Sequence, residues 1–137
     1  MLKTLKIKTV STILIILIGV IVAYIFLQQK EYTTLSDLEE LFQKHKISYQ
    51  VTPVREEYKL GTAKEQNNFL LEGNDVYVYI VDEPYFEQAV LDVTNDFFSD
   101  RVVATVNNFI FAYSEKNMAL FYAELYAIID EIRWSRK

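Results

Sequence analysis

The feature that most constrains this chain is an uncharged, mostly apolar stretch near its start. Residues 9–29 are twenty-one consecutive positions without a charged side chain, TVSTILIILIGVIVAYIFLQQ. As an α-helix they would extend about 31 Å, close to the roughly 30 Å hydrocarbon core of a bilayer. The stretch is apolar on every side, whereas a helix at the surface of a soluble domain has a polar side. The pattern predicts a transmembrane helix over residues 9–29, surrounded by membrane lipid.

Two other interpretations of this stretch stay open. A signal peptide also begins with basic residues, and Ile21-Val22-Ala23 is an acceptable cleavage site. Against cleavage, the apolar run continues through residues 24–27 and is longer than the usual core of a signal peptide. A helix buried in a globular core would also be apolar, but at this length it usually keeps one polar face. We therefore expect an uncleaved anchor, with these two as the alternatives.

Lysine placement predicts the orientation of the anchor. Three lysines lie within residues 1–8, whereas Lys30 beyond the stretch is followed at once by Glu31. The positive-inside rule then places residues 1–8 in the cytoplasm and the C-terminal domain outside. Abundant Ile, Tyr, Phe, Asn and Lys are typical of an AT-rich bacterial genome. We expect a single-pass protein of a bacterial cell membrane.

The charge and cysteine content of the remaining chain exclude several functions. From Lys30 onward, eleven basic against nineteen acidic residues give a formal charge of −8. Nucleic acid is therefore not an expected partner, because its phosphates require a basic surface. The chain has no cysteine, which excludes disulfides, a thiol nucleophile, a thiolate metal site and lipidation at cysteine.

Residues 30–34 are predicted to be a linker, and residues 35–137 one extracytoplasmic domain. Helices are expected where apolar residues recur every three to four positions, and strands where they alternate or cluster. The expected elements are a helix at 35–46, strands at 47–51 and 54–60, a loop at 61–68, a hairpin of 69–72 with 75–81, a helix from 82 to about 99, a hairpin of 101–106 with 109–113, and a helix from 114 to about 134. Hairpins favour an antiparallel sheet, so we expect an α+β domain with helices packed on one face.

Local signals predict where these elements begin and turn. Ser36 with Glu39 matches a capping box, and Asp82 can cap the helix that follows it. Gly73-Asn74 and Asn107-Asn108 are expected to form the two hairpin turns. The buried side of the last helix is expected to consist of Met118, Phe121, Leu125, Ile128 and Ile132.

Three places could carry chemistry, and each has a simpler structural explanation. His45 lies between two lysines at a helix end, where a cation interacts favourably with the helix dipole. Asp92 and Asp96 are four residues apart on a helix, which is typical of a solvated acidic face rather than a cation site. Asp82 and Glu83 adjoin at a helix start, where they favour capping over acid–base catalysis. We expect no catalytic residue, no metal site, no cofactor and no enzymatic activity.

Tyrosine is the most suggestive residue type, with ten copies in the chain. Tyr77 and Tyr79 point to the same side of their predicted strand, and Tyr113 and Tyr49 could join them. If helices cover the other side, these four side chains form an exposed face for a protein or a glycan. Alternatively, the tyrosines pack beneath a helix and have a purely structural role.

The order of elements resembles that of a known class of proteins. The strand at 75–81, a helix, the strands at 102–106 and 109–113 around Asn107-Asn108, and a closing amphipathic helix cover residues 75–133. This layout resembles small membrane-anchored or lipoprotein-type extracytoplasmic domains of Gram-positive bacteria that have no assigned activity. The chain departs from the lipoprotein versions because it lacks a lipidation cysteine. The resemblance implies location and fold type, and no functional residue.

These observations predict a membrane-tethered extracytoplasmic module without catalytic activity, which acts by protein interaction or as an accessory component. Its expected partners are membrane lipid, through residues 9–29, and another membrane or cell-surface protein. The alternative is an extracytoplasmic domain that binds a cell-wall glycan, a peptide or a small solute through its tyrosine face.

Overall fold

The computed structural model describes residues 2–28, 30–114 and 122–135. Helix α1 (Leu2–Gln28) belongs to one compact unit, and Tyr32–Ser135 form the other. Within α1, the twenty residues Lys6–Ile25 have a mean hydropathy of 2.3, and none of this segment is buried inside the protein. The predicted apolar helix is therefore present, and it is long and apolar enough to be a membrane anchor or a signal sequence.

The second unit contains a five-stranded antiparallel sheet with the strand order β1-β2-β3-β5-β4. The strands are β1 (Tyr49–Thr52), β2 (Glu65–Leu71), β3 (Asn74–Ile80), β4 (Val102–Val106) and β5 (Phe109–Tyr113). After β3 the chain crosses one face of the sheet, forms β4 at the edge and returns as β5 beside β3. Together with the helices, this sheet confirms the predicted α+β class.

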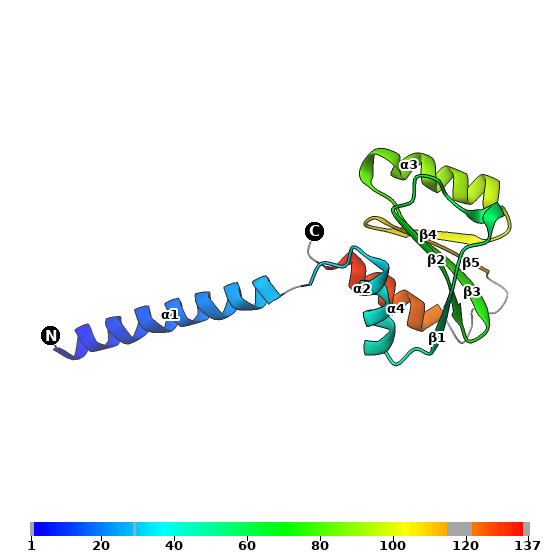
Figure 1. Cartoon of the computed structure of the whole chain (residues 1–137). Helices are drawn as coiled ribbons and strands as arrows, with labels where there is room; N and C mark the ends of the chain where they lie inside the picture. Colours follow the sequence, from blue (N-terminus) through cyan, green and yellow to red (C-terminus); the bar gives the residue numbers. More distant parts are fainter. Residues whose placement is uncertain (1, 29, 115–121, 136–137) are drawn as a thin grey trace. The chain divides into compact units, whose positions relative to one another are not determined.

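Helical segments cover both faces of the sheet (Figure 1). They are α2 (Leu35–Lys44), α3 (Glu83–Leu91), α4 (Tyr122–Arg133), the 3₁₀ turn η1 (Glu56–Tyr58) and the π-helix η2 (Asp92–Phe97), which continues α3. α2 and α4 pack on one face, and α3, η2 and the segment around η1 cover the other. The expectation of helices on one face is therefore wrong, because the connection from β3 to β4 crosses the face opposite to α2 and α4.

The central strand β3 shows how one sequence serves two cores. Val76, Val78 and Ile80 point towards α2 and α4, while Tyr77 and Tyr79 point towards α3 and η2. All five side chains are buried. Since alternate residues of a strand point to opposite faces, a strand that is covered on both sides has an uninterrupted apolar and aromatic sequence.

Helix α2 begins at Leu35 as predicted, but its capping residues differ from the prediction. Thr34 is the N-cap: its backbone is extended, and its side chain accepts a hydrogen bond from the backbone N–H of Asp37 at 3.2 Å. The Asp37 carboxylate accepts in return from the backbone N–H groups of Thr33 and Thr34, at 2.9 and 3.1 Å. The capping box is therefore Thr34 with Asp37 rather than Ser36 with Glu39, because Ser36 already lies inside the first helical turn.

The hairpin of β2 and β3 turns one residue earlier than predicted. Glu72 and Gly73 have φ angles of 51° and 81°, and Leu71 pairs with Asn74. A two-residue turn of this kind requires positive φ at both central positions, so Asn74 is free to pair in β3.

Strand β2 begins at Glu65, within the predicted loop 61–68. The sequence there looked like a loop because it is polar, but the segment pairs with β1 on one side and β3 on the other. The Gln66 amide accepts from the backbone N–H of Leu60 and donates to the Leu60 carbonyl, at 2.8 and 3.1 Å. Conversely, the predicted strand at 54–60 contains only the turn η1.

The second hairpin agrees with its prediction, with Asn107 and Asn108 in the turn and a φ of 50° at Asn107. Asp82 is the N-cap of α3, but its side chain makes no capping hydrogen bond. For the last helix, Leu125, Ile128 and Ile132 are buried as predicted. The expected start of that helix, with Met118 and Phe121, lies outside the described residues.

Candidate functional site

The four predicted tyrosines do not form one exposed surface. Tyr77 and Tyr79 are 1% and 0% exposed, beneath the segments that contain η1 and η2. Tyr113 and Tyr49 belong to the opposite face, where Tyr113 is buried and Tyr49 packs against Phe42 with the ring centroids 5.2 Å apart. The sequence correctly placed Tyr77 and Tyr79 on one side of β3, but a second helical layer covers that side.

The face beneath η2 is held by a cluster of aromatic rings. Phe98 lies 4.7 Å from Tyr77 and 4.6 Å from Tyr58, measured between ring centroids. The guanidinium of Arg101 lies 5.0 and 5.2 Å from the ring centroids of Phe98 and Tyr77. Rings at these distances stabilise one another, and a cation over a ring face adds an electrostatic attraction. The cluster therefore closes this face of the sheet.

Tyr79 adds a buried hydrogen bond to the same face. Its hydroxyl donates to the backbone carbonyl of Tyr58 at 2.7 Å. Burial raises the pKa of Tyr79 well above its ordinary value, so the hydroxyl stays protonated and remains a donor. The contact ties η1 to the centre of the sheet, which is a structural role.

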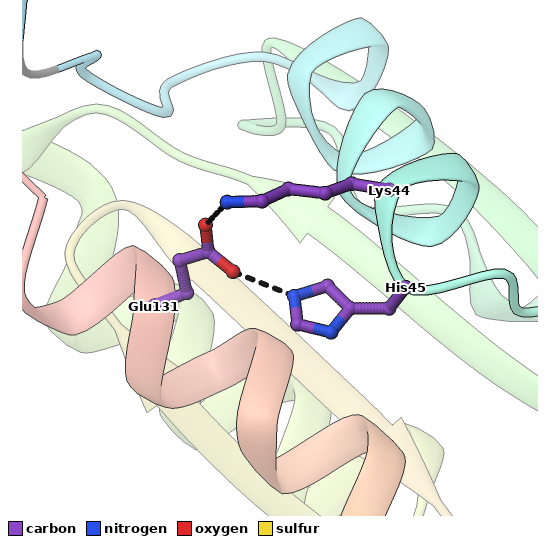
Figure 2. A network of polar contacts seen from close by, with 3 residues as sticks. All are labelled: Lys44, His45 and Glu131. Atoms are coloured by element: carbon purple, nitrogen blue, oxygen red, sulfur yellow. Dashed lines mark hydrogen bonds and ion pairs between the residues drawn. The ribbon is translucent and has the colours of Figure 1, made fainter.

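The clearest polar cluster joins α2 to α4 and consists of Lys44, His45 and Glu131 (Figure 2). One oxygen of Glu131 pairs with Nζ of Lys44, and the other lies 2.6 Å from Nε2 of His45. Partial burial raises the pKa of Glu131, but the hydrogen bonds from Lys44 and His45 outweigh it, so the pKa is lowered from its usual 4.5. The hydrogen bond between Lys44 and Glu131 also raises the pKa of Lys44.

This cluster is better suited to holding two helices together than to catalysis. Catalysis by such a group needs carboxylates or bases that converge on a cleft with separated pKa values. Glu131 instead has one oxygen paired with the Lys44 ammonium and the other in contact with the His45 ring. His45 does lie at the end of α2, as predicted, but its contact with Glu131 was not predictable because 86 residues separate them.

The acidic residues on α3 and η2 do not converge. Among the residues that the structure describes, no group of three or more His, Cys, Asp or Glu side chains could hold a metal ion. Asp92 instead accepts a hydrogen bond from the amide of Gln88 at 2.9 Å, one turn earlier. Asp82 and Glu83 are exposed at the start of α3.

The outer side of α3 exposes two large side chains, Tyr85 and Leu91, beside an open groove. We call Tyr85, Phe86, Glu87, Val90 and Leu91 the α3 surface. An open groove of about 440 Å³ is lined by four of them, and the fifth, Tyr85, is 55% exposed. Leu91 in the groove is 52% exposed. The α3 surface is the candidate site for contact with a partner.

The sequence did not single out this surface. Phe86, Val90 and Phe97 recur at helical spacing with Ala89 and Val93, which favours one buried stripe, yet these three are only partly buried. Within η2 the backbone N–H of Phe98 bonds to the carbonyl of Val93, five residues earlier, and Phe98 rather than Phe97 is fully buried. The sequence signal for an exposed apolar surface was Tyr85 and Leu91, two large side chains that lie outside this spacing.

Comparisons of the chain with protein families, curated proteins and solved structures find no match. The resemblance to membrane-anchored domains of Gram-positive bacteria therefore stays a prediction from the order of elements. Functional inference depends on α1 and on the surfaces of the domain.

Proposed function

We propose that this protein is a single-pass, membrane-tethered module that holds an acidic domain outside a bacterial cell and acts through protein contacts, without catalysing a reaction. The observation that carries the proposal is α1: its segment Lys6–Ile25 is apolar, spans twenty residues and buries nothing against the rest of the chain. Such a helix is stable only when an apolar medium surrounds it, and its length matches a bilayer. Lys3, Lys6 and Lys8 favour a cytoplasmic N-terminus.

The α3 surface is the proposed contact with the partner. Leu91 and Tyr85 expose apolar area that a partner could remove from water, and Glu83 and Glu87 add negative charge beside it. The domain as a whole is acidic, so the complementary partner carries an apolar side chain flanked by lysine or arginine. A membrane or cell-surface protein with such a segment is the expected partner class.

The alternative proposal, a face of four tyrosines that binds a glycan, required these tyrosines to be exposed on one side of the sheet. Tyr77 and Tyr79 are buried, and Tyr49 and Tyr113 lie on the other side of the sheet. Stacking on a sugar requires exposed aromatic rings. A protein partner at the α3 surface is therefore the better supported proposal.

Single-cysteine labelling tests the anchor and its orientation, since the natural chain has no cysteine. Asp100→Cys introduces a thiol at an exposed position of the domain, and Thr4→Cys introduces one near the N-terminal end of α1 without removing a lysine. A membrane-impermeant maleimide should label Asp100→Cys in intact cells and Thr4→Cys only after permeabilisation. The reverse pattern would refute the orientation. Intact protein recovered in the aqueous fraction without detergent would refute the anchor.

Photo-crosslinking tests the partner surface. A photoreactive residue at Leu91 should give a discrete crosslinked product in membranes, and Glu87→Lys should reduce its yield by reversing the local charge. The matched control is a photoreactive residue at Gln50, which is exposed on β1, on an edge strand away from α3. Equal crosslinking at both positions, or none at Leu91, would contradict the assignment of the α3 surface.

A further inference from the structure

The turn between β4 and β5 holds two distant parts of the chain at one end of the sheet. The side-chain amide of Asn107 donates to the backbone carbonyl of Ile132 at 3.0 Å. The side-chain amide of Asn108 donates to the backbone carbonyl of Thr33 at 3.2 Å. Since the two asparagines are adjacent, with Cα atoms about 3.8 Å apart, the first residues of the domain and the last turn of α4 are neighbours (Figure 1).

Trp134 lies directly beyond that last turn of α4. Its backbone N–H still bonds to the carbonyl of Asp130 at 3.1 Å, so the helix fixes its position. The Ser135 hydroxyl also donates to the carbonyl of Ile132, at 2.6 Å. Trp134 is 77% exposed, more than any other large apolar side chain of the described residues. The backbone of Trp134 is therefore held at this end of the domain, and its indole is accessible to an apolar or interfacial medium that would remove it from water.

Chain connectivity limits how far this end of the domain can lie from α1. Thr33 follows Gln28, the last residue of α1, by five residues, and an extended chain spans at most about 3.6 Å per residue. The tether therefore reaches about 18 Å at most. The headgroup layer extends roughly 5–8 Å beyond the hydrocarbon core on each side, so the tether keeps Thr33 within a short distance of the lipid surface. This step depends on the proposed function, in which α1 spans a bilayer.

We propose that Trp134 inserts its indole into the interfacial layer of the bilayer that contains α1, and so binds this end of the domain to the membrane surface. Tryptophan is enriched at this depth of a membrane because its ring is apolar and its N–H stays hydrated. The sequence around it is basic, with Arg133 before it and Arg136 and Lys137 after it, in contrast to the acidic domain. Arg133 also pairs with Asp130, 3.4 Å away, so the contact depends mainly on the indole.

Trp134 is the only tryptophan of the chain and therefore reports on its own surroundings. The experiment uses the full chain in vesicles of phosphatidylcholine and phosphatidylglycerol, with and without bromine on the acyl chains. Bromine quenches the fluorescence of a tryptophan only when the two are a short distance apart. The expected result is strong quenching and a blue-shifted emission. Unquenched emission at the wavelength of exposed tryptophan, from protein that co-floats with the vesicles, would overturn the inference.

A matched variant moves the tryptophan to the other end of the sheet. In Trp134→Phe with Gln50→Trp, the indole lies on β1, opposite Leu70, which pairs with Asp75. Ile80 pairs with Phe109, the first residue after the β4–β5 turn, and Asp75 is five residues before Ile80 on β3. Measured along the strands, the new indole therefore lies about 17 Å from the end of the sheet that carries this turn. We expect several-fold weaker quenching for this variant. Equal quenching at both positions would overturn the inference, because the domain would then have no preferred end at the membrane.

The flotation step separates this inference from the proposed function. Chain that floats with vesicles and shows an unquenched Trp134 refutes the interfacial contact but supports the anchor. Chain that stays at the bottom of the gradient refutes the anchor and the contact together. Since the first measurement uses the natural sequence, its outcome does not depend on the folding of the variant.

Discussion

The two faces of the sheet solve the same burial problem with different side chains. The face beneath α2 and α4 is covered by regular helices and filled mainly with aliphatic and phenylalanine side chains, such as Val78 and Phe111, with Tyr113 at the end of β5. The face beneath α3 and η2 contains Tyr77 and Tyr79 at the centre of the sheet, covered partly by a π-helix and a 3₁₀ turn. Aliphatic and phenylalanine side chains need only close packing, whereas a buried tyrosine must also satisfy its hydroxyl group. On the second face η1 provides such a partner, because the Tyr58 carbonyl accepts the hydrogen bond of the Tyr79 hydroxyl.

The largest expected effect tests the apolar face. Phe111→Ala removes a fully buried ring that pairs across β5 and β3 with Val78. The free energy of unfolding should fall by about 3–5 kcal/mol, since the surrounding side chains collapse only partly into the cavity. Urea denaturation of the full chain in detergent, followed by circular dichroism, measures this change. A loss below about 1 kcal/mol would mean that this face is loosely packed.

The next prediction tests the tyrosine face. Tyr79→Phe should lower the free energy of unfolding by about 1–3 kcal/mol, because the buried carbonyl of Tyr58 loses its donor. Tyr77→Phe is the matched control: it keeps the ring contact with Phe98 and should cost less. The same denaturation experiment compares the two variants. If Tyr77→Phe were the more destabilising change, the hydrogen bond to Tyr58 would not be what distinguishes the face.

A third prediction concerns the helix on the apolar face. Thr34→Ala should cost about 1 kcal/mol, since it removes the acceptor for the backbone N–H of Asp37. Ser36→Ala should stay within about 0.5 kcal/mol, because Ser36 is exposed inside the helix. Thermal melts of both variants measure the difference. The opposite order of stability would restore the capping box that the sequence suggested.

The smallest expected effect concerns the link between α2 and α4. Glu131→Gln removes the ion pair with Lys44 and the carboxylate contact with His45, and should cost about 0.5–1 kcal/mol at neutral pH, as for a partly exposed ion pair. Because the pKa of Glu131 is lowered in the folded protein, its contribution is present above the ordinary value of 4.5 and is lost as the pH falls below it. The stability difference between wild type and variant should therefore disappear in acid. Denaturation at pH values on both sides of 4.5 measures this, and a constant difference would exclude the charged form of Glu131 as its source.

Several elements were predictable because their signals are local. The apolar length of α1 predicts a bilayer span without reference to any other residue. The β-branched and aromatic runs of β4 and β5, with two asparagines between them, predict a hairpin because the turn requires a left-handed residue. The stripe of Leu125, Ile128 and Ile132 predicts the buried side of α4 from helical periodicity alone.

Other features depend on contacts that no local pattern contains. The alternation in β3 shows that two faces exist, but only the crossing of the sheet by α3 and η2 decides that both are buried. The polar residues of β2 form a strand because tertiary partners such as the Leu60 backbone satisfy Gln66. Glu131 meets His45 across 86 residues, and Asn107 and Asn108 bring Ile132 and Thr33 together. The sequence by itself determined the long apolar helix, the hairpins and the periodicity of the helices, because those depend on neighbours in the chain. Which tyrosines are covered, and that the end of α4 lies near Thr33, were decided by tertiary packing, because burial and long-range contacts are properties of the whole fold.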